Sequence, residues 1–236
     1  YNQGKYEEAL AIFETISFYK DSSTYITNCK NAINEQKYQH ALSLMNSGNY
    51  DEAIAEFESI VDYKDSQTQI YECKYRKAKA LYNSNNLIDS YNLFLEISSY
   101  KDSSTYIATI QNDADTVAQG YALAGNYQQA IDLLKAVGKT KTTSDLYAAC
   151  SDAVSGNYRS IVALLNPSKV IVVSGLKTLP SQAFYNCDNV TEIVLPNTLT
   201  TIGSYAFSGC SSLTKINMPD SFSSIVVIES GMLIFV

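Results

Sequence analysis

GNYDEAIAEF, at residues 48–57, decides how we expect this chain to fold, because close copies of it recur along residues 1–165. GKYEEALAIF precedes it at residues 4–13, and NNLIDSYNLF, GNYQQAIDLL and GNYRSIVALL follow at residues 85–94, 125–134 and 156–165. These copies begin 44, 37, 40 and 31 residues apart. Self-similarity at periods of about 20 to 50 residues is the signature of a repeat architecture. We therefore predict an array of helical units joined by segments of variable length.

Each copy places a small residue and a large residue on one helical face. In the copy at residues 48–57 these are Ala53 and Phe57, four positions apart, and Ala41 is expected to be a small contact point on the preceding helix. The Gly-Asn or Asn-Asn turn between the helices suits the left-handed backbone that ends a helix. The string YKDS follows three of the copies, and its Asp-Ser pair is expected to cap the next helix with a side-chain oxygen. Each unit then reads helix, tight turn, helix, loop.

The copies at residues 48–57 and 125–134 resemble the turn and second helix of the tetratricopeptide repeat, and the resemblance covers about residues 1–165. The YKDS loop and the longer first helix look like a variant common in Gram-positive gut bacteria. In tetratricopeptide arrays the first helices line a concave surface that holds a peptide or a partner helix, so the resemblance implies partner binding at the matching positions. Those positions are Tyr38, Leu42, Met45, Tyr75, Lys79, Tyr82 and Gln119. Ordinary packing or a solvated surface is the alternative role for each of them.

The composition changes near Asn166 and Pro167, where helix formers give way to Val, Ile, Thr, Ser and Pro. A new period of 23 residues begins there, with TLPSQAFYNCDNVTEIVLPNTL followed by TIGSYAFSGCSSLTKINMPDSF. Alternating apolar residues such as Ile193 and Leu195 indicate a half-buried strand, and the proline after them ends it. The AFxxC stretch is expected to turn the chain back along the opposite side.

This second pattern resembles the BspA-like leucine-rich repeat of bacterial surface antigens, over about residues 168–225. The resemblance rests on the strand followed by proline and on the signature I-G-x-x-A-F-x-x-C, which begins at Ile202 and ends at Cys210. It implies a cell-surface or secreted setting and contact with host or neighbouring proteins. Because the pattern stops after fewer than three coils, we expect the coils to lean on the last helical pair. Residues 226–236 are expected to cap them, either as a strand or as a contact between subunits of a homo-oligomer.

The predicted fold class is therefore α+β in sequence-separate domains. An α-solenoid of tetratricopeptide-like helix-turn-helix repeats occupies residues 1–165, and a short leucine-rich-repeat β-solenoid with an atypical tail occupies residues 166–236.

Residues that could carry chemistry are few, and each has a structural explanation. Among the five cysteines, Cys187 and Cys210 share one repeat position, which favours buried free thiols and leaves a disulfide between adjacent coils open. The single histidine, His40, lies in a helix without the partners that a nucleophile requires. Acidic pairs such as Glu7 and Glu8 fall in first helical turns, where they favour the helix dipole. We expect no catalytic residue, no metal site and no cofactor.

The net charge of −7 argues against nucleic-acid binding and against attraction to an anionic membrane, and no apolar run is long enough to insert into one. The opening residues read as a cut through a repeat, so we expect a fragment of a longer protein. The leading functional hypothesis is a non-catalytic module that binds a protein or peptide. The alternative is a structural spacer in a larger envelope protein, with binding carried elsewhere. An enzyme acting on glycans is a third hypothesis, and the sequence shows no carboxylate spacing that implies one.

Overall fold

The structure is a computed structural model that describes residues 1–218, 226–227 and 233–234. Its described part is mostly helical, with nine helices followed by short strands, which agrees with helical repeats that precede a leucine-rich segment. The chain divides into two compact units, Tyr1–Ile107 and Ala108–Val236. The change of composition near Asn166 therefore lies inside the second unit, and the predicted solenoid form of each part stays a prediction.

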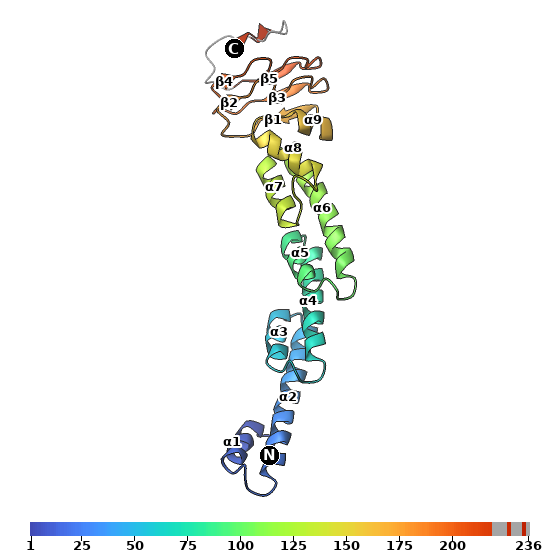
Figure 1. Ribbon diagram of the computed structural model, residues 1–236, viewed down its shortest axis with the longest axis vertical. Helices are drawn as coiled ribbons and strands as arrows, with labels where there is room; N and C mark the ends of the chain where they lie inside the picture. The colour runs from blue at the N-terminus through green and yellow to red at the C-terminus, as the bar shows by residue number, and fades with distance from the viewer. Residues whose placement is uncertain (219–225, 228–232, 235–236) are drawn as a thin grey trace. The chain divides into compact units, whose positions relative to one another are not determined.

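The first unit is a series of paired helices (Figure 1). It contains α1 (Tyr6–Thr15), α2 (Ser22–Asn46), α3 (Tyr50–Glu58), α4 (Ser66–Asn83), α5 (Leu87–Glu96) and the start of α6 (Ser103–Leu123). Each helix from α1 to α4 packs against the next one in the chain. Helix α2 has 25 residues and α4 has 18, and this difference accounts for the unequal repeat spacings of 44 and 37.

The predicted small and large residues form the contact between paired helices. Ala53 and Phe57 of α3 are fully buried, as is Ala41 of α2. The rings of Tyr38 and Phe57 meet edge to face with centroids 5.6 Å apart, an arrangement that aromatic pairs favour. The periodicity therefore identified the helix–helix contact correctly.

The YKDS loops do not cap helices in the way the sequence suggested. Asp21 and Asp65 stand at the N-caps of α2 and α4, but neither side chain accepts a capping hydrogen bond. The Asp65 carboxylate instead accepts a 2.5 Å hydrogen bond from the Tyr38 hydroxyl. The serine hydroxyl bonds to its own loop, because Ser66 Oγ donates to the carbonyl of Tyr63 at 2.6 Å. The capping prediction was therefore wrong for both loops, and in the second loop the aspartate holds a tyrosine of α2 instead.

The second unit joins helices to a leucine-rich segment. After α6 come α7 (Tyr127–Ala136), α8 (Asp145–Val154) and α9 (Arg159–Leu165). Strands β1 (Lys169–Ile171), β3 (Glu192–Val194) and β5 (Lys215–Asn217) form a parallel sheet in that order, and β2 (Thr178–Leu179) pairs in parallel with β4 (Thr201–Ile202). Ile193 lies opposite Val170 on one side and Ile216 on the other, so the register follows the 23-residue period.

The leucine-rich coils share one core with the helices that precede them. Tyr158, just before α9, stacks on Phe184 with centroids 4.7 Å apart and ring planes 5° from parallel, and Phe184 stacks in turn on Phe207 at 5.7 Å. The backbone repeats this relation, because Tyr158 N donates to the carbonyl of Ala183 and Phe184 N donates to that of Ala206. Tyr158 is thus the first member of the aromatic ladder, and the expected support from the last helical pair is confirmed.

The C-terminal tail contributes β6 (Val226–Val227) and β7 (Leu233–Ile234), which pair with each other in antiparallel fashion. The prediction that residues 226–236 cap the coils falls mainly on residues outside the described ones.

Candidate interaction surfaces

The seven positions matched to a tetratricopeptide groove lie in different environments. Tyr38, Met45 and Tyr75 are buried, and each tyrosine is only 8% exposed. Leu42, Lys79 and Tyr82 are half-buried, and Gln119 is exposed. Lys79 Nζ lies 5.3 Å from the ring centroid of Tyr75, and Tyr82 makes an edge contact with Tyr106. The burial of three of the seven fits a packing role, and partner binding by any of them stays a prediction.

The buried tyrosines belong to a polar network that is present twice, with its two copies 37 residues apart. Glu35 of α2 accepts hydrogen bonds from the Tyr63 hydroxyl at 2.6 Å and from Lys64 Nζ at 2.5 Å. These bonds, from Lys64 first and Tyr63 second, lower the pKa of Glu35 from 4.5 to about 2. Hydrogen bonding to the Asp65 carboxylate, together with burial, raises the pKa of Tyr38 to about 12.

The same network recurs one repeat later, at positions shifted by 37. Tyr75 donates to Asp102 at 2.6 Å and Tyr100 donates to Glu72 at 3.0 Å, and Lys101 pairs with that same glutamate. Two copies of one hydrogen-bond pattern show that the side chains of a YKDS loop hold the helix before the one that leads into the loop, α2 in the first copy and α4 in the second.

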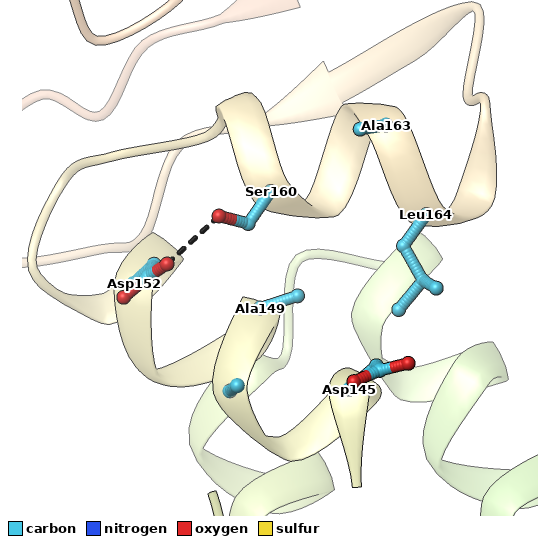
Figure 2. Close-up of a pocket in the computed structure, with 7 residues that line it drawn as sticks. Asp145, Ala149, Asp152, Ser160, Ala163 and Leu164 are labelled. Carbon is cyan, nitrogen blue, oxygen red and sulfur yellow. Dashed lines mark hydrogen bonds between the residues drawn. The ribbon is translucent and has the colours of Figure 1, made fainter.

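The second unit has an open furrow between α8 and α9 (Figure 2). Its volume is about 360 Å³. We call it the α8–α9 furrow, and it is lined by Asp145, Ala148, Ala149, Asp152, Ser160, Ala163 and Leu164. The furrow stays open at its alanines because each of these side chains is only a methyl group. Leu164 is 43% exposed, a large apolar side chain that the fold leaves in contact with water.

Carboxylates flank this apolar floor. Asp152 accepts a 2.8 Å hydrogen bond from Ser160 Oγ, which ties α8 to α9 across one end of the furrow (Figure 2). At the other end, Asp145 is exposed and has no hydrogen-bond or ion-pair partner within the part of the chain that the structure describes. It follows Ser144, whose hydroxyl caps α8 by accepting from the amide of Tyr147.

A second hollow of about 490 Å³ continues from the furrow, because both are lined by Asp145 and Leu164. It brings in Gln119, the one exposed member of the predicted groove set, from α6. Lys139 also lines it, but this ammonium is already paired with Asp115. The furrow therefore has an apolar floor with carboxylates at its edges, whereas the second hollow is lined mainly by polar and charged side chains.

The leucine-rich sheet presents a different surface. Glu192 on the central strand lies 3.2 Å from Lys169 Nζ and 3.3 Å from Lys215 Nζ on the two outer strands. The hydrogen bond from Lys169 is the main reason why the pKa of Glu192 is lowered. The charges of this row are therefore largely paired within the sheet.

The furrow was not apparent from the sequence. Ala163 and Leu164 read as ordinary helix formers, and only the spacing of α8 and α9 shows that they face open space. A weak signal was present in Asp152, where the repeat pattern leads one to expect an apolar residue.

Four of the five cysteines are buried, as expected of packing residues, and Cys210 is half-buried. All five are free thiols, and burial raises the pKa of Cys187 to about 12. Cys210 Sγ donates to the carbonyl of Phe184 at 3.0 Å, so this thiol links one coil to the coil before it. Within the described residues, no group of His, Cys, Asp or Glu is arranged to hold a metal ion, and no helix is long and apolar enough to cross a bilayer.

Helical repeats followed by stacked parallel coils place the chain among repeat proteins. Residues 165–227 match a family model described as BspA type leucine rich repeat region (6 copies), which confirms the leucine-rich part of the fold. This family is associated with protein interaction and with bacterial surface proteins. No curated protein and no solved structure matches the chain. The tetratricopeptide character of the helical part rests on its sequence resemblance and on its paired helices.

Proposed function

We propose that this chain is a non-catalytic interaction module of a bacterial surface or envelope protein, and that it binds a protein or peptide through the α8–α9 furrow. The observation that carries the proposal is the exposed Leu164 at the floor of an open furrow edged by unneutralised carboxylates. Exposed apolar surface rimmed by polar groups commonly marks an interaction site. The leucine-rich family match supports the surface setting.

The chemistry of the furrow favours a partner segment with an apolar side chain next to lysine or arginine. The apolar group would cover Leu164 and the alanines, and the cations would approach Asp145 and Asp152. Complementary charges of this kind raise association rates and exclude acidic competitors. A neutral or acidic segment would leave the Asp145 carboxylate without a counter-charge.

A peptide library tests this preference on the whole chain of 236 residues. Fluorescent peptides that carry one leucine flanked by two lysines should bind more tightly than peptides with the same leucine flanked by two glutamates. Ala163→Arg places a long cation in the furrow and should abolish the binding. Ala55→Arg is the matched control, because Ala55 is an exposed helical alanine of the first unit. Equal binding by both variants would place the site elsewhere.

The partner itself can then be sought in two extracts, the bacterial envelope and host matrix. A protein retained by the wild-type chain and by Ala55→Arg, but not by Ala163→Arg, is the expected result. If the folded chain retains neither peptides nor proteins, the interaction proposal fails.

The alternative function, a structural spacer, is favoured by the repeated tyrosine–carboxylate network. Tyr38 and Tyr75 each fix a helix to the loop that follows the next helix, which stiffens the helical repeats. A spacer would bind none of the probes above. Homo-oligomerisation through residues 226–236 stays a separate proposal, and the mass of the chain in solution with and without those residues tests it.

A further inference from the structure

The exposed face of α1 is the same face that α3 and α5 use to receive a neighbouring helix. Phe57 and Phe94 are fully buried beneath α2 and α4, and Ile60 and Ile97 are 4% and 2% exposed. The equivalent residues of the first repeat are Phe13 and Ile16. Phe13 is only half-buried, and Ile16 is 37% exposed.

Each occupied face also satisfies three polar groups of its YKDS loop. The helix seated on α3 offers Glu35 to the tyrosine and lysine of the loop and Tyr38 to its aspartate. The helix seated on α5 offers Glu72 and Tyr75 in the same roles. Both helices carry the pattern E-x-x-Y-x-x-A, in which Ala41 or Ala78 is fully buried.

The first YKDS loop has the same tyrosine, lysine and aspartate, but no helix with the E-x-x-Y-x-x-A pattern packs against it in the described part of the chain. Tyr19 is 53% exposed, and Lys20 lies above its ring at 5.1 Å. In the part of the chain that the structure describes, the side chains of Tyr19, Lys20 and Asp21 have no hydrogen-bond or ion-pair partner. On α1 itself, a hollow of about 310 Å³ is lined in part by Ala9, Ile12 and Phe13.

We propose that this face, which we call the α1 seat, binds a helix with the E-x-x-Y-x-x-A pattern, supplied by another repeat of the same type. The tyrosine of that helix donates to the Asp21 carboxylate, and its glutamate accepts from Tyr19 and pairs with Lys20. The occupant is not α2 or α4 of a second copy, because those helices already cover α3 and α5. The α1 seat is separate from the α8–α9 furrow, so the proposal does not depend on the proposed function.

The internal repeats provide the probe. Tyr1 stands at the repeat position of Met45 and Tyr82, so a copy of residues 66–81 joined directly ahead of Tyr1 continues the pattern without a gap. This extension contains Glu72, Tyr75 and Ala78 and is added to the full chain. The measurement is hydrogen exchange of the amides of α1, with the solution mass as a second readout.

The expected result is that the extension slows exchange in α1 by tenfold or more while the chain stays monomeric. An extension with Ala78→Arg in the added copy is the matched control and should leave the exchange unchanged. On the receiving side, Asp21→Asn with Tyr19→Phe should remove part of the protection, and both residues are exposed, so the chain itself should still fold. The proposal is overturned if the extended chain and its Ala78→Arg control exchange alike, or if the protection appears only with a doubled mass.

Discussion

Replacing Phe184 by alanine tests whether the leucine-rich coils depend on the helices. Phe184 is fully buried between Tyr158 and Phe207. Truncation of a buried phenylalanine costs about 3–5 kcal/mol, and the loss of two stacked pairs places the expected value in the upper half of that range. Folded domains are stable by only about 5–15 kcal/mol, so Phe184→Ala should remove a large fraction of the stability of the second unit.

The assay is urea unfolding followed by circular dichroism, combined with hydrogen exchange of peptides that cover α9 and β3. Because Tyr158 stacks on Phe184 and donates its amide to Ala183, α9 should lose protection together with β3. Phe18→Ala makes the same truncation at a side chain that is 90% exposed, and it should change stability by less than about 0.5 kcal/mol. The reasoning is refuted if Phe184→Ala costs less than about 1.5 kcal/mol, half the lower limit for a buried phenylalanine, or if α9 keeps its protection while β3 loses it.

Three further predictions concern other features of the fold. Because Lys64 and its neighbours hold the pKa of Glu35 near 2, below its ordinary value of 4.5, the Glu35 carboxylate stabilises the folded chain above pH 4.5, and this contribution is lost as the pH falls from 4.5 to 2. Glu35→Gln should therefore lower the urea midpoint at pH 7 but not at pH 2, and an equal effect at both pH values would contradict the assignment. Gly203→Ala should destabilise the coils, because a Cβ atom there would lie 2.3 Å from Ser181 N. Gly120→Ala, inside α6 with nothing within 4 Å, should stabilise the chain by about 0.5–1 kcal/mol, and thermal melts of both variants would reveal a wrong sign.

The periodic parts of the fold could be predicted from the sequence because stacking imposes its own spacing on the residues. A spacing of four residues places Ala53 and Phe57 on one face of a helix. The 23-residue period places Val170, Ile193 and Ile216 opposite one another in neighbouring strands. Such positions are fixed by burial, and burial is what an apolar pattern records.

The partners of polar groups could not be predicted in the same way. Asp65 has the right residue type and position to cap α4, but the Tyr38 hydroxyl, 27 residues earlier, takes its carboxylate. The local sequence does not show which side chain of a distant helix reaches such a carboxylate once the helices pack. The α8–α9 furrow escaped prediction for a related reason, because the exposure of Leu164 depends on how closely two helices approach.

The position of Tyr158 limits how repeats can be exchanged between proteins of this kind. The change of composition near Pro167 looks like a natural junction for recombination, since helical repeats lie before it and leucine-rich repeats after it. A chain joined there would lose the ring that covers Phe184 and the hydroxyl that accepts from the amide of Val173. A leucine-rich segment can move to a new host intact only if it takes the Tyr158 turn and α9 with it, so the inherited unit is longer than the sequence repeat.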